Sequence, residues 1–331
     1  MQVCIDWLQI NSRGRLVECP LFKLRSTDKH SQVFANITEI LYKNKVVAIS
    51  AHNPYSKIMP ENTNIIKFMN DELYNPEFPN IYNTVIKKMG VNFVGFTRVD
   101  LAYDFNEFAH HRNPEILIRQ YLSGQLTYWG KTMYQNRGRN NYNMIPDYLR
   151  FGGADSLLSI YLYRKEYEMR CKTWKPYISK NWKLNGLDLN KSVWRLEISI
   201  KGNQHTFCEK MTGEATKLTQ SMVLDASLRF DLYFSIIAKM FQFCYITRGN
   251  HRNTKSFIKI FDVDFNPWLY FIQNETQDST RADRIMIKKL ESLNWELRQQ
   301  KNPVADSAQE LSEFIAESKG LEKYRQSVSM D

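Results

Sequence analysis

Three segments of the chain alternate between apolar and polar residues, which is typical of half-buried β-strands. They are residues 97–105 (TRVDLAYDF), 158–165 (LSIYLYRK) and 193–201 (VWRLEISIK). A period of two places successive side chains on opposite faces of a sheet. If the three strands share a sheet with their polar faces aligned, carboxylates, tyrosines and cations meet on one surface, which is the candidate active site. The polar face would carry Arg98, Asp100, Ala102, Asp104, Ser159, Tyr161, Tyr163, Lys165, Arg195, Glu197, Ser199 and Lys201.

Apolar residues at helical spacing predict helices between and after these strands. The segments are residues 62–74, 81–89, 115–122 and 218–245, and Pro114 and Gly124 stand at the two ends of the third. Residues 3–10 and 33–50 read as further strands. The chain therefore predicts an α+β fold, in which helices pack on an antiparallel-rich central sheet. Two capping patterns after residue 280 predict a C-terminal helical tail, so we divide the chain into a main domain, 1–265, and a tail, 266–331.

The composition is that of a soluble globular protein with a basic surface. The chain has 331 residues, of which 43% are hydrophobic, and a net charge of +10. Such a charge suits a polyanionic partner such as nucleic acid, although it also serves simple solubility. Five widely spaced cysteines without a CxxC pair argue against a disulfide framework and against a structural zinc site. No secretion signal or membrane span is apparent, so we expect a cytoplasmic protein that does not enter membranes.

Basic residues in polar segments are the candidate DNA contacts. Residues 135–143 (QNRGRNNYN) lack periodicity and read as an exposed loop, which could hold phosphates or be a solvated hairpin tip. Basic residues after position 247 recur at steps of three and four, and would form a basic stripe if that segment were helical. The candidate DNA-binding residues are Arg98, Arg137, Arg139, Arg150, Arg195, Lys201, Arg248, Arg252 and Lys255.

The carboxylates of the polar face suit a divalent cation. Asp100, Asp104 and Glu197 offer the oxygen ligands that Mg²⁺ and Mn²⁺ prefer. A cation there could polarise a phosphodiester and help a tyrosine hydroxyl, whose ordinary pKa is about 10, to attack it. The alternative is that Arg98 and Arg195 simply pair with these carboxylates as structural ion pairs.

Four motifs stand in a characteristic order along residues 3–265. They are IDWLQI at 5–10, R-x-D-x-A-x-D at 98–104, a glycine-then-serine turn at 151–156 that leads to Y-x-K at 163–165, and W-R-x-E-x-x-x-K at 194–201. Together they resemble the Rep-trans, or replication initiation factor, family of plasmid rolling-circle replication initiators, which also includes relaxases of integrative and conjugative elements.

The resemblance implies a magnesium- or manganese-dependent enzyme that cuts one strand of an origin hairpin and rejoins it. Such an enzyme stays linked through a tyrosine to the 5′ phosphate and leaves a 3′ hydroxyl. Tyr163 occupies the position of the family's nucleophile, and Lys165 would neutralise charge in the transition state. Asp100 and Glu197 occupy the acidic positions, with Asp104 as a further candidate. Tyr161 stands where the family often has arginine, so either tyrosine could be the nucleophile.

The resemblance also implies partners and a location. The expected partner is a DNA origin hairpin, with a host helicase and a second copy of the chain as further partners, in the cytoplasm of a bacterial host cell. A relaxase of a conjugative or integrative element would use the same chemistry. A non-catalytic DNA-binding protein that uses only its basic surface is the alternative from a different class.

Overall fold

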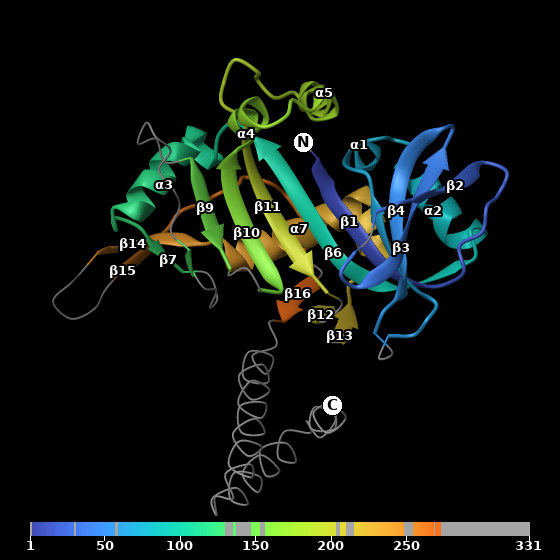
Figure 1. Ribbon diagram of the computed structural model, residues 1–331. Coiled ribbons are helices and arrows are strands. Elements are labelled where there is room, and N and C mark those ends of the chain that lie inside the picture. Colours follow the sequence, from blue (N-terminus) through green and yellow to red (C-terminus); the bar gives the residue numbers. More distant parts are fainter. Residues whose placement is uncertain are drawn as a thin grey trace, which may run out of the picture. The chain divides into compact units, whose positions relative to one another are not determined.

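A ten-stranded sheet forms the centre of the molecule. The computed structural model describes residues 2–29, 31–56, 59–129, 135–136, 147–152, 156–202, 206–209, 215–247, 254–267 and 269–272. All neighbouring strands of this sheet run antiparallel (Figure 1). From one edge to the other the strands are β2 (Phe22–Thr27), β3 (Phe34–Tyr42), β4 (Lys45–Pro54), β5 (Thr63–Phe68), β1 (Val3–Gly14), β6 (Val91–Phe105), β11 (Trp194–Lys201), β10 (Leu158–Arg164), β9 (Tyr148–Phe151) and β8 (Gln135–Asn136).

Helices and two small sheets complete the described part of the chain. The small sheets each have three strands. One has the order β13 (Ala215–Lys217), β12 (Thr206–Glu209), β16 (Leu269–Ile272), and the other has the order β15 (Thr254–Phe257), β14 (Phe243–Thr247), β7 (Thr127–Tyr128). The predicted α+β fold with an antiparallel central sheet is therefore confirmed. The remaining elements are α1 (Asn70–Leu73), α2 (Phe78–Lys88), η1 (Ala109–His111), α3 (Pro114–Leu122), α4 (Lys165–Cys171), α5 (Pro176–Leu184), α6 (Gln220–Leu224) and α7 (Ala226–Met240).

One face of the central sheet is covered by α7, which runs behind β1, β6, β11 and β10 (Figure 1). The apolar residues of the alternating strands turn toward this helix, and Leu101, Leu196 and Leu232 belong to one hydrophobic core. The Tyr233 hydroxyl of α7 donates a hydrogen bond of 2.7 Å to the Leu196 carbonyl. Because the apolar residues of these strands face α7, their polar residues lie on the opposite face of the sheet.

The prediction of a helix over residues 62–74 is wrong for most of its length. Thr63–Phe68 is a strand, β5, and the short helix α1 begins only at Asn70. Asn64, Ile66 and Phe68 are buried at alternate positions, and β5 pairs with β1 on one side and β4 on the other. Pairing on both sides therefore outweighed the helical spacing of the apolar residues.

The other three helix predictions are confirmed. Of the predicted residues 81–89, all but the last lie in α2, Phe78–Lys88. Residues 115–122 lie in α3, where the Asn113 side chain accepts a hydrogen bond of 2.9 Å from the Glu115 backbone NH. Most of residues 218–245 lies in α6 and α7.

The main compact unit spans Met1–Ile272. Residues 269–272, placed in the tail by the sequence, form β16 and pair with β12. The tail beyond residue 272 lies outside the described residues. Among the helices that the structure describes, none has the length and apolar character needed to cross a bilayer.

Candidate active site

The strand register brings the three predicted polar faces together. In antiparallel strands, directly opposed residues point to the same face. Strands β10, β11 and β6 are neighbours, so each cross-strand row holds three residues. The predicted alignment of the polar faces is therefore confirmed. The rows are Tyr163, Arg195 and Asp104; Tyr161, Glu197 and Ala102; and Ser159, Ser199 and Asp100.

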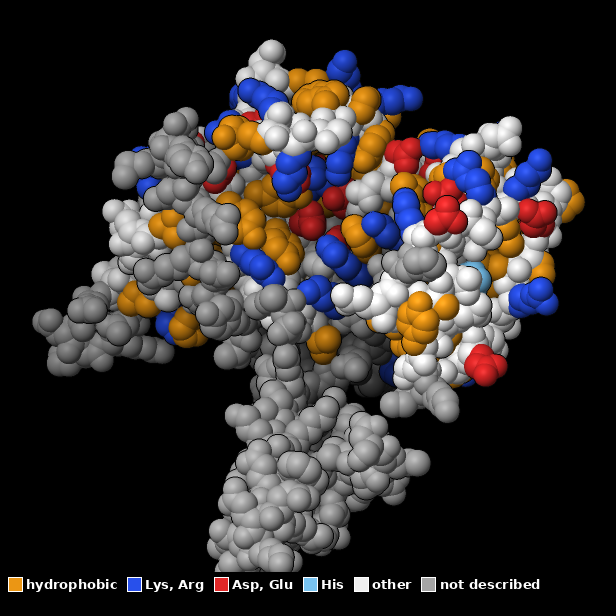
Figure 2. All heavy atoms as spheres, viewed as in Figure 1, with side chains coloured by type: hydrophobic (Ala, Val, Ile, Leu, Met, Phe, Trp, Pro, Cys, Tyr) orange, Lys and Arg blue, Asp and Glu red, His pale blue; other side chains and the backbone are white. Residues whose placement is uncertain are grey.

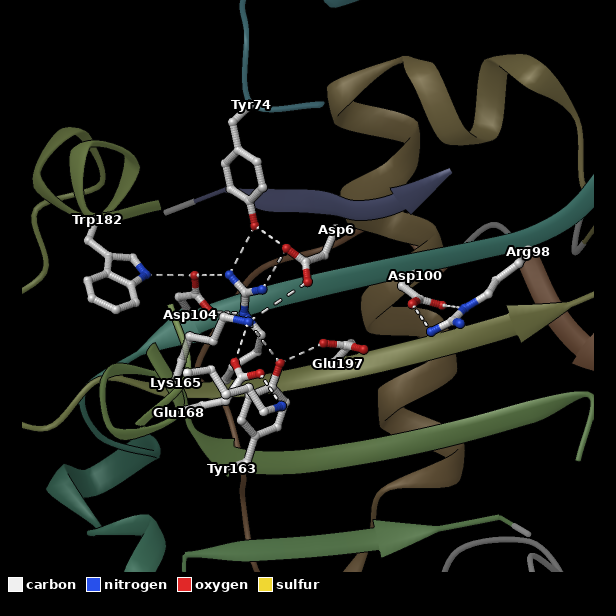
Figure 3. A network of polar contacts seen from close by, with 12 residues as sticks. Asp6, Tyr74, Arg98, Asp100, Asp104, Tyr163, Lys165, Glu168, Trp182 and Glu197 are labelled. Carbon is white, nitrogen blue, oxygen red and sulfur yellow. Dashed lines mark hydrogen bonds and ion pairs between the residues drawn. The ribbon is translucent and has the colours of Figure 1, made fainter. Parts of the chain in front are cut away.

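Tyr163 lies between a carboxylate and an ammonium group (Figure 3). Its hydroxyl donates a hydrogen bond of 2.8 Å to Glu197 Oε2 and accepts one of 3.3 Å from Lys165 Nζ. Part of the tyrosine surface remains exposed. Burial of the hydroxyl and the charge of Glu197 raise the pKa of Tyr163 well above its usual value. The phenol is therefore protonated, and its proton is directed at Glu197.

Glu197 is a buried carboxylate whose ionised form is disfavoured by its surroundings. Burial, together with the negative charges of Asp6 and Asp100, raises its pKa to about 7. Within the described part of the chain, its hydrogen-bond partner is the Tyr163 hydroxyl on Oε2. At neutral pH this group can accept a proton, and a nearby positive charge would stabilise its ionised form.

Lys165 approaches the phenol from the first turn of α4, rather than from the strand that the sequence predicted. Its side chain is only 2% exposed and forms an ion pair of 2.8 Å with Glu168 Oε2. A second carboxylate, Asp6, lies 4.0 Å from Nζ. Burial and the nearby Arg195 lower the pKa of Lys165. The lysine is thus held in place by carboxylates while it contacts the tyrosine.

Arg195 is completely buried and ties the strands together. It contacts Asp104 through Nε at 2.6 Å and Nη2 at 2.7 Å, and forms an ion pair of 2.8 Å with Asp6. The Tyr74 hydroxyl accepts from Arg195 at 3.0 Å and donates to Asp6 at 2.7 Å. Trp182 Nε1 donates to Asp104 at 2.8 Å. The expectation that Arg195 contacts DNA is therefore wrong for this structure, because its side chain is enclosed and occupied by internal partners.

Asp100 lies on the same face and pairs with Arg98 of its own strand. Arg98 donates from Nε to Oδ1 at 2.9 Å and from Nη2 to Oδ2 at 2.5 Å. Burial raises the pKa of Asp100 even though the arginine opposes that shift. The alternative reading, in which Arg98 and Arg195 pair with carboxylates, is confirmed for Asp100 and Asp104 alike.

The three predicted metal ligands do not form one group. No cluster of three or more His, Cys, Asp or Glu suited to a metal occurs among the described residues. Asp104 is engaged by Arg195 and Trp182, whereas Asp100 and Glu197 are diagonal neighbours on adjacent strands. Their carboxylate oxygens are ligands that a hard divalent cation prefers, and such a cation would offset the burial and the charges of Asp6 and Asp100 that raise the pKa of Glu197. This pair, rather than the trio, is the candidate metal site.

Basic side chains surround the acidic centre. Figure 2 shows Lys and Arg around a hollow in the sheet face, with Asp and Glu at its floor. Among the predicted DNA contacts, Arg150 Cζ lies 5.3 Å from the ring centroid of Tyr161, and Lys201 is opposite Arg98 in the register. Lys255 lies on strand β15, not on a helix, with Nζ 3.2 Å from the ring centroid of Trp129. The other predicted contacts, Arg137, Arg139, Arg248 and Arg252, lie outside the described residues.

Asp6 is the most important site residue that sequence reasoning missed. It sits at a β-bulge, where Ile5 opposes Leu101 and Trp7 already opposes Asp100. The extra residue lets Ile5 and Leu8 both reach the core. The signal was present in the sequence, because these two buried positions cannot face the same side of a regular strand. Tyr74, Glu168 and Trp182 come from helices or helix ends and carried no comparable signal.

The chain is similar to proteins of known structure. The structure of a rolling circle replication initiator protein from Geobacillus stearothermophilus is similar at 12% sequence identity and a TM-score of 0.42, over 76% of this chain and 89% of that chain. No protein-family model and no curated protein sequence matches the chain.

Proposed function

We propose that the chain is a rolling-circle replication initiator that cuts and rejoins one DNA strand through Tyr163. The observation that supports this most directly is the Tyr163 hydroxyl, which donates to Glu197 at 2.8 Å and accepts from Lys165 at 3.3 Å. The proton acceptor and the cation are each within hydrogen-bond reach of the nucleophile, as activation of a weak nucleophile requires. Two of the motifs behind the family resemblance supply these residues: Y-x-K at 163–165 and W-R-x-E-x-x-x-K at 194–201.

The proposed reaction is a reversible transfer of a phosphodiester to the phenol. The Tyr163 oxygen attacks the phosphorus and its proton passes to Glu197. The bond from phosphorus to the 3′ oxygen breaks, and that oxygen leaves as a hydroxyl after taking a proton from solvent. The 5′ phosphate remains esterified to the tyrosine. Lys165 offsets the negative charge that develops between the phenol oxygen and the phosphate. Attack by a 3′ hydroxyl on the phosphotyrosine rejoins the strand.

Tyr163 is favoured over Tyr161 as nucleophile by its contacts. In the described part of the chain, the Tyr161 ring packs under Arg150, whereas the Tyr163 hydroxyl contacts both Glu197 and Lys165. Activation of a phenol needs a base or a cation at its oxygen, and only Tyr163 has both there.

Asp100 and Glu197 are the residues that would hold Mg²⁺ or Mn²⁺. When bound, such an ion would polarise the phosphodiester. Arg98 must release Asp100 for this, because its guanidinium occupies both carboxylate oxygens. Once released, Arg98 is available to a DNA phosphate on the same face.

Covalent attachment tests the proposal. Single-stranded oligonucleotides that carry the stem-loops found beside the coding region, labelled at the 3′ end, are mixed with the full chain and Mn²⁺. A labelled protein band that survives SDS is expected from the wild type and from Tyr161→Phe, but not from Tyr163→Phe. Loss of the band in Tyr161→Phe alone would assign the nucleophile to Tyr161.

Absence of a band from the wild type with every stem-loop, alongside measurable DNA binding, would refute the proposed chemistry. The basic surface would then belong to a non-catalytic DNA-binding protein.

A further inference from the structure

A cluster of two cations and one indole lies beside Asp100 on the polar face of the sheet. Lys67 Nζ is 3.6 Å and Arg98 Cζ is 4.4 Å from the ring centroid of Trp7. Strand β1, which carries the indole, lies between β5 and β6, which carry the two cations. Gln9 is opposite both cations in the register. We call Trp7, Lys67 and Arg98 the Trp7 cluster.

The bulge at Asp6 is what turns the indole to this face. Trp7 opposes Asp100, and Ile5 opposes Leu101, so Asp6 is the extra residue between them. Without the bulge, period-two alternation would send Trp7 to the same side as buried Ile5. Asp6 already alternates with Ile5 and reaches Arg195, and the bulge places the indole on the same face, opposite Asp100.

The cluster lacks an anion for one of its two cations. Arg98 is paired with Asp100, but Lys67 forms no ion pair with any residue that the structure describes, and its contact is the indole face. Burial and the charge of Arg98 lower the pKa of Lys67. A bound anion would stabilise the charged form of a half-buried ammonium that lies beside a guanidinium. The indole ring attracts both cations and so holds them at this position.

We propose that the Trp7 cluster binds a backbone phosphate of the single DNA strand whose scissile phosphate reacts at Tyr163. This inference rests on the proposed function and deepens it. The cluster lies on β1, β5 and β6, and β6 is next to β11, so it is about 10–15 Å along the sheet from Glu197. A few nucleotides of an extended strand cover that distance.

The opposite side of the acidic centre has a related arrangement. On β9 and β10, Arg150 lies over the ring of Tyr161. Cation–aromatic contacts thus flank Asp100 and Glu197 on both sides, along the direction that crosses the strands. A DNA strand that crosses the sheet would meet a cation before and after the reacting phosphate.

Binding without cutting provides the test. The full chain carrying Tyr163→Phe is titrated with a fluorescent oligothymidylate at several salt concentrations, without divalent cations. Lys67→Gln is added to this background and compared with Lys43→Gln. Lys43 is a matched control, because its ammonium also lies over a ring, that of Tyr42, at 5.1 Å, and it stands in the turn between β3 and β4.

Lys67→Gln should weaken oligothymidylate binding roughly fivefold and reduce the slope of log K against log salt by about 0.7, which corresponds to one lost phosphate contact. Lys43→Gln should leave affinity and slope unchanged. Equal behaviour of the two variants would overturn the inference. So would a loss for Lys67→Gln that appears with duplex DNA only.

The indole is tested separately. Trp7→Ala should weaken oligothymidylate binding about as much as Lys67→Gln does. Trp7→Phe keeps an aromatic face and should therefore weaken binding less. If circular dichroism shows that Trp7→Ala is unfolded, the comparison of Lys67→Gln with Lys43→Gln alone tests whether the Trp7 cluster binds DNA. The adduct assay separates this inference from the proposed function. A wild-type adduct with no Lys67 effect refutes the subsite, and a Lys67 effect without any adduct refutes the nicking chemistry.

Discussion

The Tyr163 hydroxyl and Glu197 Oε2, on neighbouring strands of the sheet, share a hydrogen bond of 2.8 Å in which the phenol is the donor. The two residues are not directly opposite each other, since Tyr163 faces Arg195 and Glu197 faces Tyr161. This diagonal contact leaves Arg195 free to hold Asp104 and Asp6 beneath the site. The proton path from Tyr163 to Glu197 and the structural ion pairs of Arg195 therefore use separate residues of neighbouring strands.

Glu197→Gln should slow adduct formation by about 100-fold or more, because an amide can accept the hydrogen bond but cannot take up the proton. The rate of adduct formation in a single turnover measures this. Glu39→Gln is the control, since Glu39 pairs with Arg25 on β2, outside the candidate site. A rate for Glu197→Gln within about threefold of the wild type would exclude Glu197 as the proton acceptor.

Arg195→Met should destabilise the fold strongly, because it leaves Asp6 and Asp104 without their buried partner. Loss of one member of a buried ion pair typically costs about 3–5 kcal/mol. Urea unfolding measures the change. Arg25→Met is the matched control, because Arg25 also pairs with a carboxylate, but its side chain is 60% exposed. We expect a change below about 1 kcal/mol there. Similar midpoints for the two variants would contradict the role assigned to Arg195.

Asp6 should make the fold sensitive to acid. Burial alone would raise its pKa, but Arg195, Lys165 and the Tyr74 hydroxyl lower it below the usual value. A lowered pKa means that the contribution of Asp6 to stability is complete above the usual pKa of about 3.9 and is lost as the pH falls through the lowered one. The stability difference between wild type and Asp6→Asn, measured by urea unfolding, should therefore shrink as the pH falls from about 5 to about 2. A difference that stays constant would contradict this.

Alternation in the sequence was enough to predict the central part of the site. In residues 97–105, 158–164 and 194–201, apolar residues at every second position reach the core, so the polar set between them had to share one face once the strands paired. This alternation depends only on residues within each strand, so contacts with the rest of the chain do not change it. It placed Tyr163, Glu197 and Asp100 together without knowledge of the rest of the chain.

Other parts of the site depend on contacts that no local pattern reports. The local pattern of β5 predicts a helix, because its strand character comes from pairing with β1 and β4. The pattern therefore does not place Lys67 on the polar face. The bulge at Asp6 breaks the alternation and places Trp7 on a face that continued alternation from Ile5 would not give it. Asp104 looked equivalent to Asp100, and only packing shows that Arg195 and Trp182 occupy it.

Divalent cations should stabilise the protein more at alkaline than at acidic pH. The pKa of Glu197 is raised to about 7, so its protonated form stabilises the cation-free fold below the usual pKa of about 4.5, and this contribution is lost as the pH rises through 7. A cation that binds ionised Glu197 would restore the lost stability. The increase in melting temperature caused by Mn²⁺ should therefore be larger at about pH 8 than at about pH 6, and absent in Glu197→Gln. An equal increase at both pH values in the variant would place the cation elsewhere.

Arg98 and a cation compete for Asp100, because the guanidinium contacts both of its oxygens. Arg98→Gln should therefore strengthen Mn²⁺ binding by roughly fivefold in the absence of DNA, and weaken oligothymidylate binding because the Trp7 cluster loses a cation. Titration calorimetry measures the first effect and fluorescence anisotropy the second. Arg150→Gln is the matched control for net charge, since Arg150 contacts the Tyr161 ring on the same face. If both variants strengthen Mn²⁺ binding equally, the gain reflects general electrostatics, and direct competition at Asp100 is refuted.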